Sequence, residues 1–193
     1  MRQLVLASTS RYRAAVLARL GRPFVQAAPD CDEDAAARLE TVPSRLVWSL
    51  AREKAWSVAA RFPDALVLGG DQLAVLGDEV LGKPGTPERA QAQLERLSGQ
   101  THRLLTAVAL VDPGAARTLV ALDVHHLRMR RLSRAEIEAY VARDLPLDCA
   151  GSYRVEGAGP QLFECVRGDD PSAIEGLPLG RVAHLLRTLE RST

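Results

Sequence analysis

The chain has 193 residues, and its 25 Lys and Arg residues balance 24 Asp and Glu residues to a formal net charge of +1. This balance excludes a broad basic face for nucleic acid, so any anion-binding site must be local. Three widely spaced cysteines without a Cys-x-x-Cys pair argue against a disulfide framework and a zinc site, and they fit a reducing cytoplasm. With no leader-like or membrane-spanning pattern, we expect a cytoplasmic protein without a membrane partner.

The first predicted elements are a strand and a helix joined by hydroxyl side chains. The apolar run Gln3–Ala7 is typical of a buried strand, and Ser8-Thr9-Ser10 then opens an Arg-rich helix that ends near Gly21. The acidic and polar residues 29–43 predict a loop.

The second predicted helix carries a lysine on its apolar stripe. Ser44 is expected to cap this helix, which reaches about Phe62, and Lys54 lies four residues from apolar positions on either side. Its ammonium group therefore either extends to the edge of the core along a packed stem or reaches a cleft that holds an anion.

A glycine-rich segment follows, and it is the most informative part of the chain. An apolar strand stops at Gly69, and the alternating stretch Leu73–Leu81 reads as a hairpin with its turn at Gly77-Asp78. In the expected register, Asp71 and Lys83 lie side by side at the hairpin base. Such a pair suits polyphosphate chemistry, because the acid can hold a metal or activate water while the lysine neutralises phosphate oxygens. A surface ion pair is the alternative.

The remaining chain alternates helices and strands. The predicted elements are a helix capped by Thr86 through Leu97, an antiparallel ribbon of strands 104–111 and 118–128, a helix from the Ser133 capping box to about Arg143, two strands around a glycine-rich turn within 149–168, and a last helix from Pro178. Together they predict one α/β domain over residues 1–193, with a mixed twisted sheet and flanking helices.

The hydroxyl turn is a candidate phosphate site. Side chains of Ser8 and Ser10, with free backbone N–H groups at a strand-to-helix turn, form an anion cradle to which Arg13 adds a guanidinium. The segment is not a P-loop, since Gly-x-x-x-x-Gly-Lys-Ser/Thr is absent from the sequence. An ordinary helix cap with surface arginines is the alternative.

Separated charges elsewhere complete the candidate site. Glu33 and Asp71 are candidate ligands for a hard divalent ion, and Lys54, Lys83 and Arg13 are candidate phosphate clamps. A polyphosphate leaves water at a high cost unless cations in the site compensate its negative charges. Each cation can do so because a unit charge pair at ~4 Å is worth on the order of 4 kcal/mol at an effective dielectric near 20.

These residues fall into blocks that occur in a fixed order: Ser8-Thr9-Ser10 with Arg13, Asp32-Glu33, Glu53-Lys54-Ala55, Gly70-Asp71-Gln72, Gly82-Lys83-Pro84, Ser98-Gly99-Gln100-Thr101-His102 with Thr106, and Ala150-Gly151-Ser152. Through them the chain resembles, over essentially its whole length, the Maf-like nucleoside triphosphate pyrophosphatases. One departure is that Ala14 follows Arg13, where the family often has a second arginine.

The resemblance implies a fold, a reaction and a set of roles. It implies an ITPase-like α/β fold with two lobes around a central cleft, in a cytoplasmic homodimer. It further implies that Mg²⁺, Mn²⁺ or Co²⁺ supports cleavage of a nucleoside triphosphate to the monophosphate and pyrophosphate. Asp71 would accept the proton of the attacking water, and Glu33, Lys54 and Lys83 would belong to the same site.

Three further residues resemble the pattern of the YceF-type branch, which prefers 7-methylguanosine triphosphate: Tyr12, Gln72 and Glu156. The methylated purine is positively charged, and a cation–π contact with Tyr12 would contribute about 0.5–2 kcal/mol. Glu156 would accept hydrogen bonds from the two adjacent N–H donors of guanine. The alternatives are a dTTP or UTP pyrophosphatase, and a nucleotide-binding regulator of septum formation.

Overall fold

The computed structural model describes residues 2–191, with Asp34 described by its backbone alone. In chain order the elements are β1 (Leu4–Ala7), α1 (Arg11–Ala18), β2 (Phe24–Ala27), α2 (Glu33–Leu39), α3 (Pro43–Ala59), β3 (Leu66–Leu76), β4 (Glu79–Leu81), α4 (Pro87–Leu97), β5 (Thr101–Asp112), β6 (Arg117–Met129), α5 (Arg134–Asp144), the 3-10 turns η1 (Ala150–Ser152) and η2 (Gly159–Leu162), β7 (Phe163–Arg167), the 3-10 turn η3 (Pro171–Glu175) and α6 (Leu179–Glu190).

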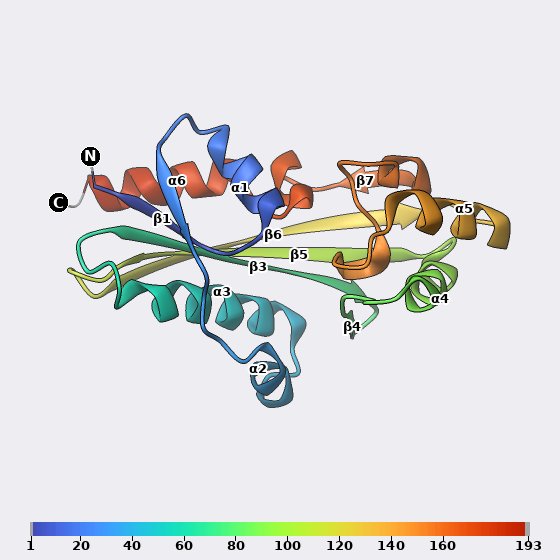
Figure 1. The fold of residues 1–193 in the computed structure, drawn as a ribbon, viewed down its shortest axis with the longest axis horizontal. Helices are drawn as coiled ribbons and strands as arrows, with labels where there is room; N and C mark the ends of the chain where they lie inside the picture. The colour runs from blue at the N-terminus through green and yellow to red at the C-terminus, as the bar shows by residue number, and fades with distance from the viewer. Residues whose placement is uncertain (1, 192–193) are drawn as a thin grey trace. The chain divides into compact units, whose positions relative to one another are not determined.

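The strands form one mixed sheet in the order β2-β1-β3-β5-β6-β7, with β4 paired to β3. The predicted α/β class, with a mixed sheet and flanking helices, is confirmed (Figure 1). The chain forms two compact units: one within segments 1–72, 106–123 and 170–193, the other within 73–105 and 124–169. Among the described residues, no helix is long and apolar enough to cross a membrane.

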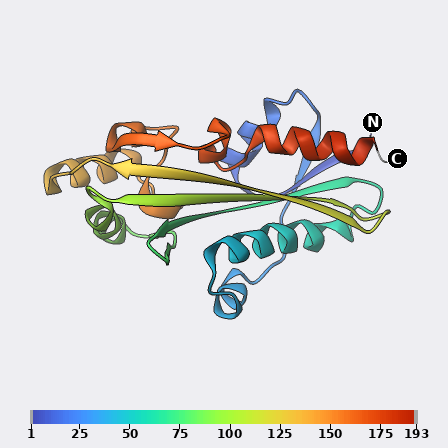
Figure 2. The same ribbon diagram turned by 180° about the vertical axis from the view of Figure 1, so that it is seen from behind.

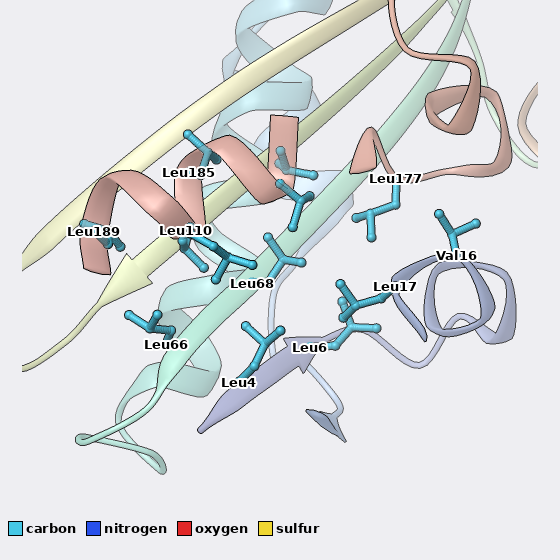
Figure 3. Packing of buried hydrophobic residues seen from close by; sticks show 13 residues of the cluster. Leu4, Leu6, Val16, Leu17, Leu66, Leu68, Leu110, Leu177, Leu185 and Leu189 are labelled. Atoms are coloured by element: carbon cyan, nitrogen blue, oxygen red, sulfur yellow. The ribbon is translucent and has the colours of Figure 1, made fainter. Parts of the chain in front are cut away.

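The core of the first unit is built on two parallel strands. β1 pairs with β3 in a register that sets Leu4 opposite Leu66 and Leu6 opposite Leu68. Because side chains alternate along a strand, these four leucines share one face of the sheet. Figure 3 shows them meeting leucines and valines of α1 and α6. Burying one such side chain contributes about 1.5–3 kcal/mol, so this cluster fixes both helices on that face.

The other face of these strands is covered by α3, which lies across from α6 in both ribbon views (Figures 1 and 2). The contact is close because Gly69 faces the helix without a side chain. A Cβ atom at this position would lie 2.2 Å from the Ala51 carbonyl oxygen and 2.7 Å from the Ala55 nitrogen. Gly69 therefore lies within a strand and permits the helix to approach, so the prediction that the strand ends at this glycine is wrong.

The hairpin register that the sequence predicts is confirmed. β3 and β4 pair Ala74 with Leu81, Val75 with Val80 and Leu76 with Glu79, around a turn in which Gly77 has a φ of 62°. This antiparallel ladder ends at Leu81, so its recorded pairs do not extend to Lys83. The placement of Lys83 beside Asp71 at the hairpin base stays a prediction.

Two helix starts differ from the sequence-based expectation. Residues 29–43 are not one loop, because the side chain of Asp32 accepts a hydrogen bond from the Ala35 N–H group at 2.8 Å and starts α2. Ser44 is not a cap, since α3 begins at Pro43, which occupies its first turn. The Thr86 cap and the Ser133 capping box are confirmed.

In the second unit, the segment before β7 is irregular. The first of the two strands predicted within 149–168 is replaced by η1 and by turns, because Gly151 and Ser152 have φ values of 76° and 61°. Such left-handed backbone cannot continue a strand. The second predicted strand is confirmed as β7.

An aromatic cluster anchors this irregular segment to β5. The Nε2 atom of buried His102 lies 3.0 Å from the Tyr153 hydroxyl oxygen, and Tyr153 packs edge-on against Phe163 at 5.0 Å between ring centroids. Burial lowers the pKa of His102 to about 4. Its Nδ1 atom has no hydrogen-bond partner among the described residues, which agrees with a neutral ring.

We predict that Gly69→Ala lowers the free energy of unfolding by about 1–3 kcal/mol, because the new methyl group overlaps the backbone of α3. Gly114→Ala is the control, since its Cβ would meet neighbours only at 3.7 Å. Urea unfolding of both variants measures the difference. Equal stability of the two variants would show that α3 moves away without cost.

We predict a pH-dependent loss of stability that depends on His102. Its pKa is lower in the folded state than the ordinary 6.5, so the stabilisation is complete above pH 6.5 and is lost as the pH falls toward 4. Between pH 7.5 and 4.5 the loss is about 2–3 kcal/mol. The free energy of unfolding is measured at several pH values for each protein. We expect this loss at low pH to be absent in His102→Gln and unchanged in His126→Gln, a control at an exposed position. Parallel slopes for wild type and His102→Gln would refute the assignment.

Candidate active site

The lysine on the apolar stripe of α3 joins two carboxylates. The Nζ atom of Lys54 lies 2.5 Å from Asp71 Oδ1 and 2.7 Å from Glu33 Oε1. The side chains of Lys54 and Asp71 are each only 7% exposed. The ammonium group of Lys54 therefore does not extend to solvent at the edge of the core. It contacts anionic groups, which are the carboxylates of Asp71 and Glu33.

Burial and charge act in opposite directions on this lysine. Burial lowers the pKa of Lys54, but the neighbouring carboxylates of Asp71 and Glu33 raise it, and the net change is upward. The ammonium group thus keeps its proton at neutral pH. Removing one partner from such a buried pair leaves an uncompensated charge, which is far more costly than the pair itself.

Local contacts place Glu33 beside the lysine. The preceding segment is held by two hydrogen bonds, one from the Asp30 N–H group to Ser57 Oγ of α3 at 3.1 Å and one from Arg61, just after α3, to the Ala28 carbonyl oxygen at 2.6 Å. Asp32 then caps α2, so Glu33 is the first residue of that helix. The Glu33 side chain is 50% exposed and forms the solvent-facing end of the charged group.

The predicted phosphate cradle forms a second connected group. Ser8 Oγ accepts hydrogen bonds from the Ser10 N–H group at 3.2 Å and from the Arg13 guanidinium at 3.4 Å. Ser10 Oγ caps α1 by accepting from the Arg13 N–H group, and Arg13 Nε donates to the Gly176 carbonyl oxygen at 3.2 Å. The sequence therefore brings the three predicted residues together at the start of α1.

Gln72 lies on the other face of β3 from Asp71, because successive residues of a strand alternate. Its Nε2 donates to Thr106 Oγ1 at 2.9 Å and to the Ala173 carbonyl oxygen at 2.8 Å. Thr106 also donates to the same carbonyl at 3.1 Å. Since a carbonyl only accepts, these bonds fix the orientation of the amide and leave its Oε1 as the group that Gln72 can offer a ligand.

The aromatic ring of Tyr12 already meets a cation. The Arg11 guanidinium carbon lies 4.9 Å from the ring centroid, and Arg11 donates to the Tyr12 hydroxyl at 2.8 Å. Tyr12 is half-buried on α1. Its position agrees with a ring face that can accept positive charge.

Two predicted site residues belong to the second unit. Lys83 is exposed in a short turn, and Glu156 is exposed in the turn that follows Tyr153. The Glu156 turn is held by Asp144, whose Oδ2 accepts from the Ala158 N–H group at 2.6 Å. Membership of both residues in one site with Asp71 stays a prediction.

Two carboxylates could hold a divalent cation. Among the side chains that the structure describes, which leave out Asp34, no group of three or more His, Cys, Asp and Glu residues could enclose a metal. Glu33 and Asp71 nevertheless converge on one cationic point, the Lys54 ammonium. One or two carboxylates, completed by water and substrate phosphate, are the usual protein ligands of Mg²⁺, so the donor set fits.

Sequence reasoning missed one neighbour of the charged group. Burial raises the pKa of the Cys31 thiol, while the nearby charge of Lys54 opposes the rise. The thiol therefore lies within the electrostatic field of the group, half-buried and protonated at neutral pH. The only feature of the sequence that could have indicated this proximity is the position of Cys31, two residues before Glu33.

Comparison with known proteins gives a consistent result over nearly the whole chain. A family model described as "Maf-like protein" matches residues 3–189. A "7-methyl-GTP pyrophosphatase" of Xanthomonas axonopodis pv. citri is 51% identical over 187 residues, covering 97% of this chain and 96% of that protein. A protein of the same name from Chromohalobacter salexigens is 46% identical with the same coverage.

A solved structure shares the fold. The HAM1 protein of Coxiella burnetii has a TM-score of 0.56 at 18% sequence identity, covering 97% of this chain and 100% of that chain. At this identity the likeness concerns the fold alone. The family match and the two relatives together show that the chain belongs to the Maf-like family.

Proposed function

We propose that the protein hydrolyses 7-methyl-GTP to 7-methyl-GMP and pyrophosphate. The observation that carries the proposal is the buried Lys54, held between Asp71 and Glu33 within a chain of the Maf-like family. Relatives that are 46–51% identical over nearly their full length carry the name of this activity. Such an enzyme would keep methylated guanine nucleotides out of RNA synthesis.

In the proposed reaction, Lys54 holds the Asp71 carboxylate in position through their contact of 2.5 Å, and this carboxylate accepts a proton from water. The water oxygen attacks the α-phosphorus, the bond from this phosphorus to the oxygen that bridges to the β-phosphate breaks, and pyrophosphate leaves with that oxygen. Ser8, Ser10 and Arg13 bind phosphate oxygens through hydroxyl, backbone N–H and guanidinium donors. Lys83 adds a positive charge that the departing pyrophosphate requires.

We further propose that Glu33 and Asp71 hold a divalent cation, Mg²⁺, Mn²⁺ or Co²⁺. When bound, this ion would neutralise phosphate oxygens and orient the anhydride. The active form would be a cytoplasmic homodimer that binds the nucleotide rather than nucleic acid.

Base selection in this proposal rests on Tyr12, Gln72 and Glu156. The Tyr12 ring would stack on the positively charged methylated purine, as its contact with the Arg11 guanidinium suggests. The Gln72 Oε1 atom and the Glu156 carboxylate are both acceptors, which suits the N–H donors of guanine and not the acceptor-rich edge of a pyrimidine.

The first test is a nucleotide panel with product analysis. We predict that 7-methyl-GTP yields pyrophosphate and 7-methyl-GMP, with kcat/KM at least about tenfold above dTTP and UTP, because one cation–π contact and one hydrogen bond supply about that factor. A pyrimidine triphosphate that is cleaved tenfold faster would assign the dTTP or UTP activity instead. Tight nucleotide binding with turnover near zero would favour the regulator of septum formation.

The second test concerns the proton acceptor. We predict that Asp71→Asn lowers kcat at least about 100-fold, because general-base catalysis typically contributes 10²–10⁴-fold. The fold should persist, since an amide of the same shape can still accept from Lys54. Asp78→Asn, at a fully exposed turn position, is the control and should retain wild-type kcat. Near-normal pyrophosphate release by Asp71→Asn would overturn the role.

A further inference from the structure

The block Ala150-Gly151-Ser152 has no role in the reaction proposed above, yet the conformation of its serine is restrained by burial and by a hydrogen bond. Ser152 is completely buried and has a left-handed φ of 61°. A residue with a Cβ atom adopts this backbone only where its surroundings hold it there. At Ser152 the restraint is a hydrogen bond of 2.5 Å between its Oγ atom and Oε1 of Gln93 on α4.

The other end of the Gln93 side chain holds the turn that carries Lys83. Gln93 Nε2 donates to the Gly82 carbonyl oxygen at 3.0 Å. That carbonyl can only accept, so the amide nitrogen must face Gly82 and the amide oxygen must face Ser152, which therefore donates. The result is a directed relay from the Ser152 hydroxyl through Gln93 to the peptide bond before Lys83.

The same turn is fixed on its far side. The Gly85 N–H group donates to the Leu147 carbonyl oxygen at 3.0 Å, and Gly85 has a φ of 73°, which favours glycine. The backbone of residues 82–85 is thus held at both ends, while the Lys83 side chain itself is exposed. A long, flexible cation is presented from a rigid base.

We propose that Gln93, supported by Ser152, is the positioning residue for Lys83. By fixing the peptide bond before the lysine, the relay lowers the conformational entropy that is lost when the ammonium group meets a phosphate. Only an amide serves at this position, because the relay needs an acceptor for Ser152 and a donor for Gly82 on one planar group. The role of Lys83 in this inference rests on the proposed function.

The first experiment measures the relay without any nucleotide. Amide hydrogen exchange at Gly85, whose N–H group is hydrogen-bonded, is compared in wild type, in Gln93→Met, which removes both bonds at nearly constant size, and in Gln91→Met as a control on the same helix. The expected result is at least about tenfold faster exchange in Gln93→Met alone, with Tm within about 8 °C of wild type, the largest shift that corresponds to loss of two hydrogen bonds. Unchanged exchange would overturn the proposal, and it would do so even if the protein cleaved no nucleotide.

The second experiment asks whether the relay acts through the lysine. Gln93→Met should lower kcat/KM for 7-methyl-GTP about tenfold, mainly through KM, and Ser152→Ala should produce a smaller loss of the same kind. In a Lys83→Ala background, Gln93→Met should have no further effect. Dissociation constants for 7-methyl-GTP in the Asp71→Asn background replace kcat/KM if turnover is too low to measure. An equal loss with and without Lys83 would show a general structural role and overturn the inference.

Discussion

The close approach of α3 to β3 is the constraint on which the charged group depends. Gly69 leaves no side chain between the helix and the strand, so the helix axis lies near enough for Lys54 to reach Asp71 two residues along the same face. A larger residue would push α3 away from β3, because its Cβ atom would lie only 2.2 Å from the Ala51 carbonyl oxygen. Such a shift would lengthen the 2.5 Å contact between Lys54 and Asp71 and weaken it, since Coulomb energy and hydrogen-bond geometry both depend on distance.

Burial of this pair is tolerable because the pair is part of a larger charge balance. Two carboxylates share one ammonium group, which leaves a net negative charge, and the half-exposed Glu33 keeps that charge in contact with water. Arg13 acts on Lys54 from the hydroxyl turn and opposes the effect of the carboxylates on its pKa. A charged group held in this way is organised before any ligand binds, which is what an enzyme needs for electrostatic stabilisation.

Local patterns predicted much of this structure, and contacts between distant segments account for the rest. The hairpin register, the Thr86 cap, the Ser133 capping box and the α/β class followed from short-range rules. The sequence did not reveal that Gly69 lies within a strand, because a glycine pair reads as a strand end unless the approaching helix is known. The polar composition of residues 29–43 predicts a loop where α2 forms, and in the sequence Gln93 is only one polar residue of a predicted helix.

The structure brings several of the predicted site residues into contact with one another. The hydroxyl turn joins Arg13, as its sequence indicates, whereas Lys54, expected to clamp phosphate, contacts the two carboxylates that were expected to bind a metal. The amide of Gln72, however, is oriented by Thr106 and by a carbonyl more than 100 residues away along the chain, and no sequence pattern encodes that contact.

Successive side chains of β3 point to opposite faces of the sheet, so Asp71 and Gln72 have different surroundings although they are adjacent in the sequence. Asp71 projects toward α3 and Gln72 projects toward η3, so a substitution at position 72 alters surroundings that Asp71 does not share. In the proposed function, the nucleotide that the protein accepts can therefore diverge during evolution while the hydrolytic residues are left intact. Insertion or deletion of a single residue before Asp71 would exchange the two faces, so this short stretch tolerates replacement of side chains but not a change in length.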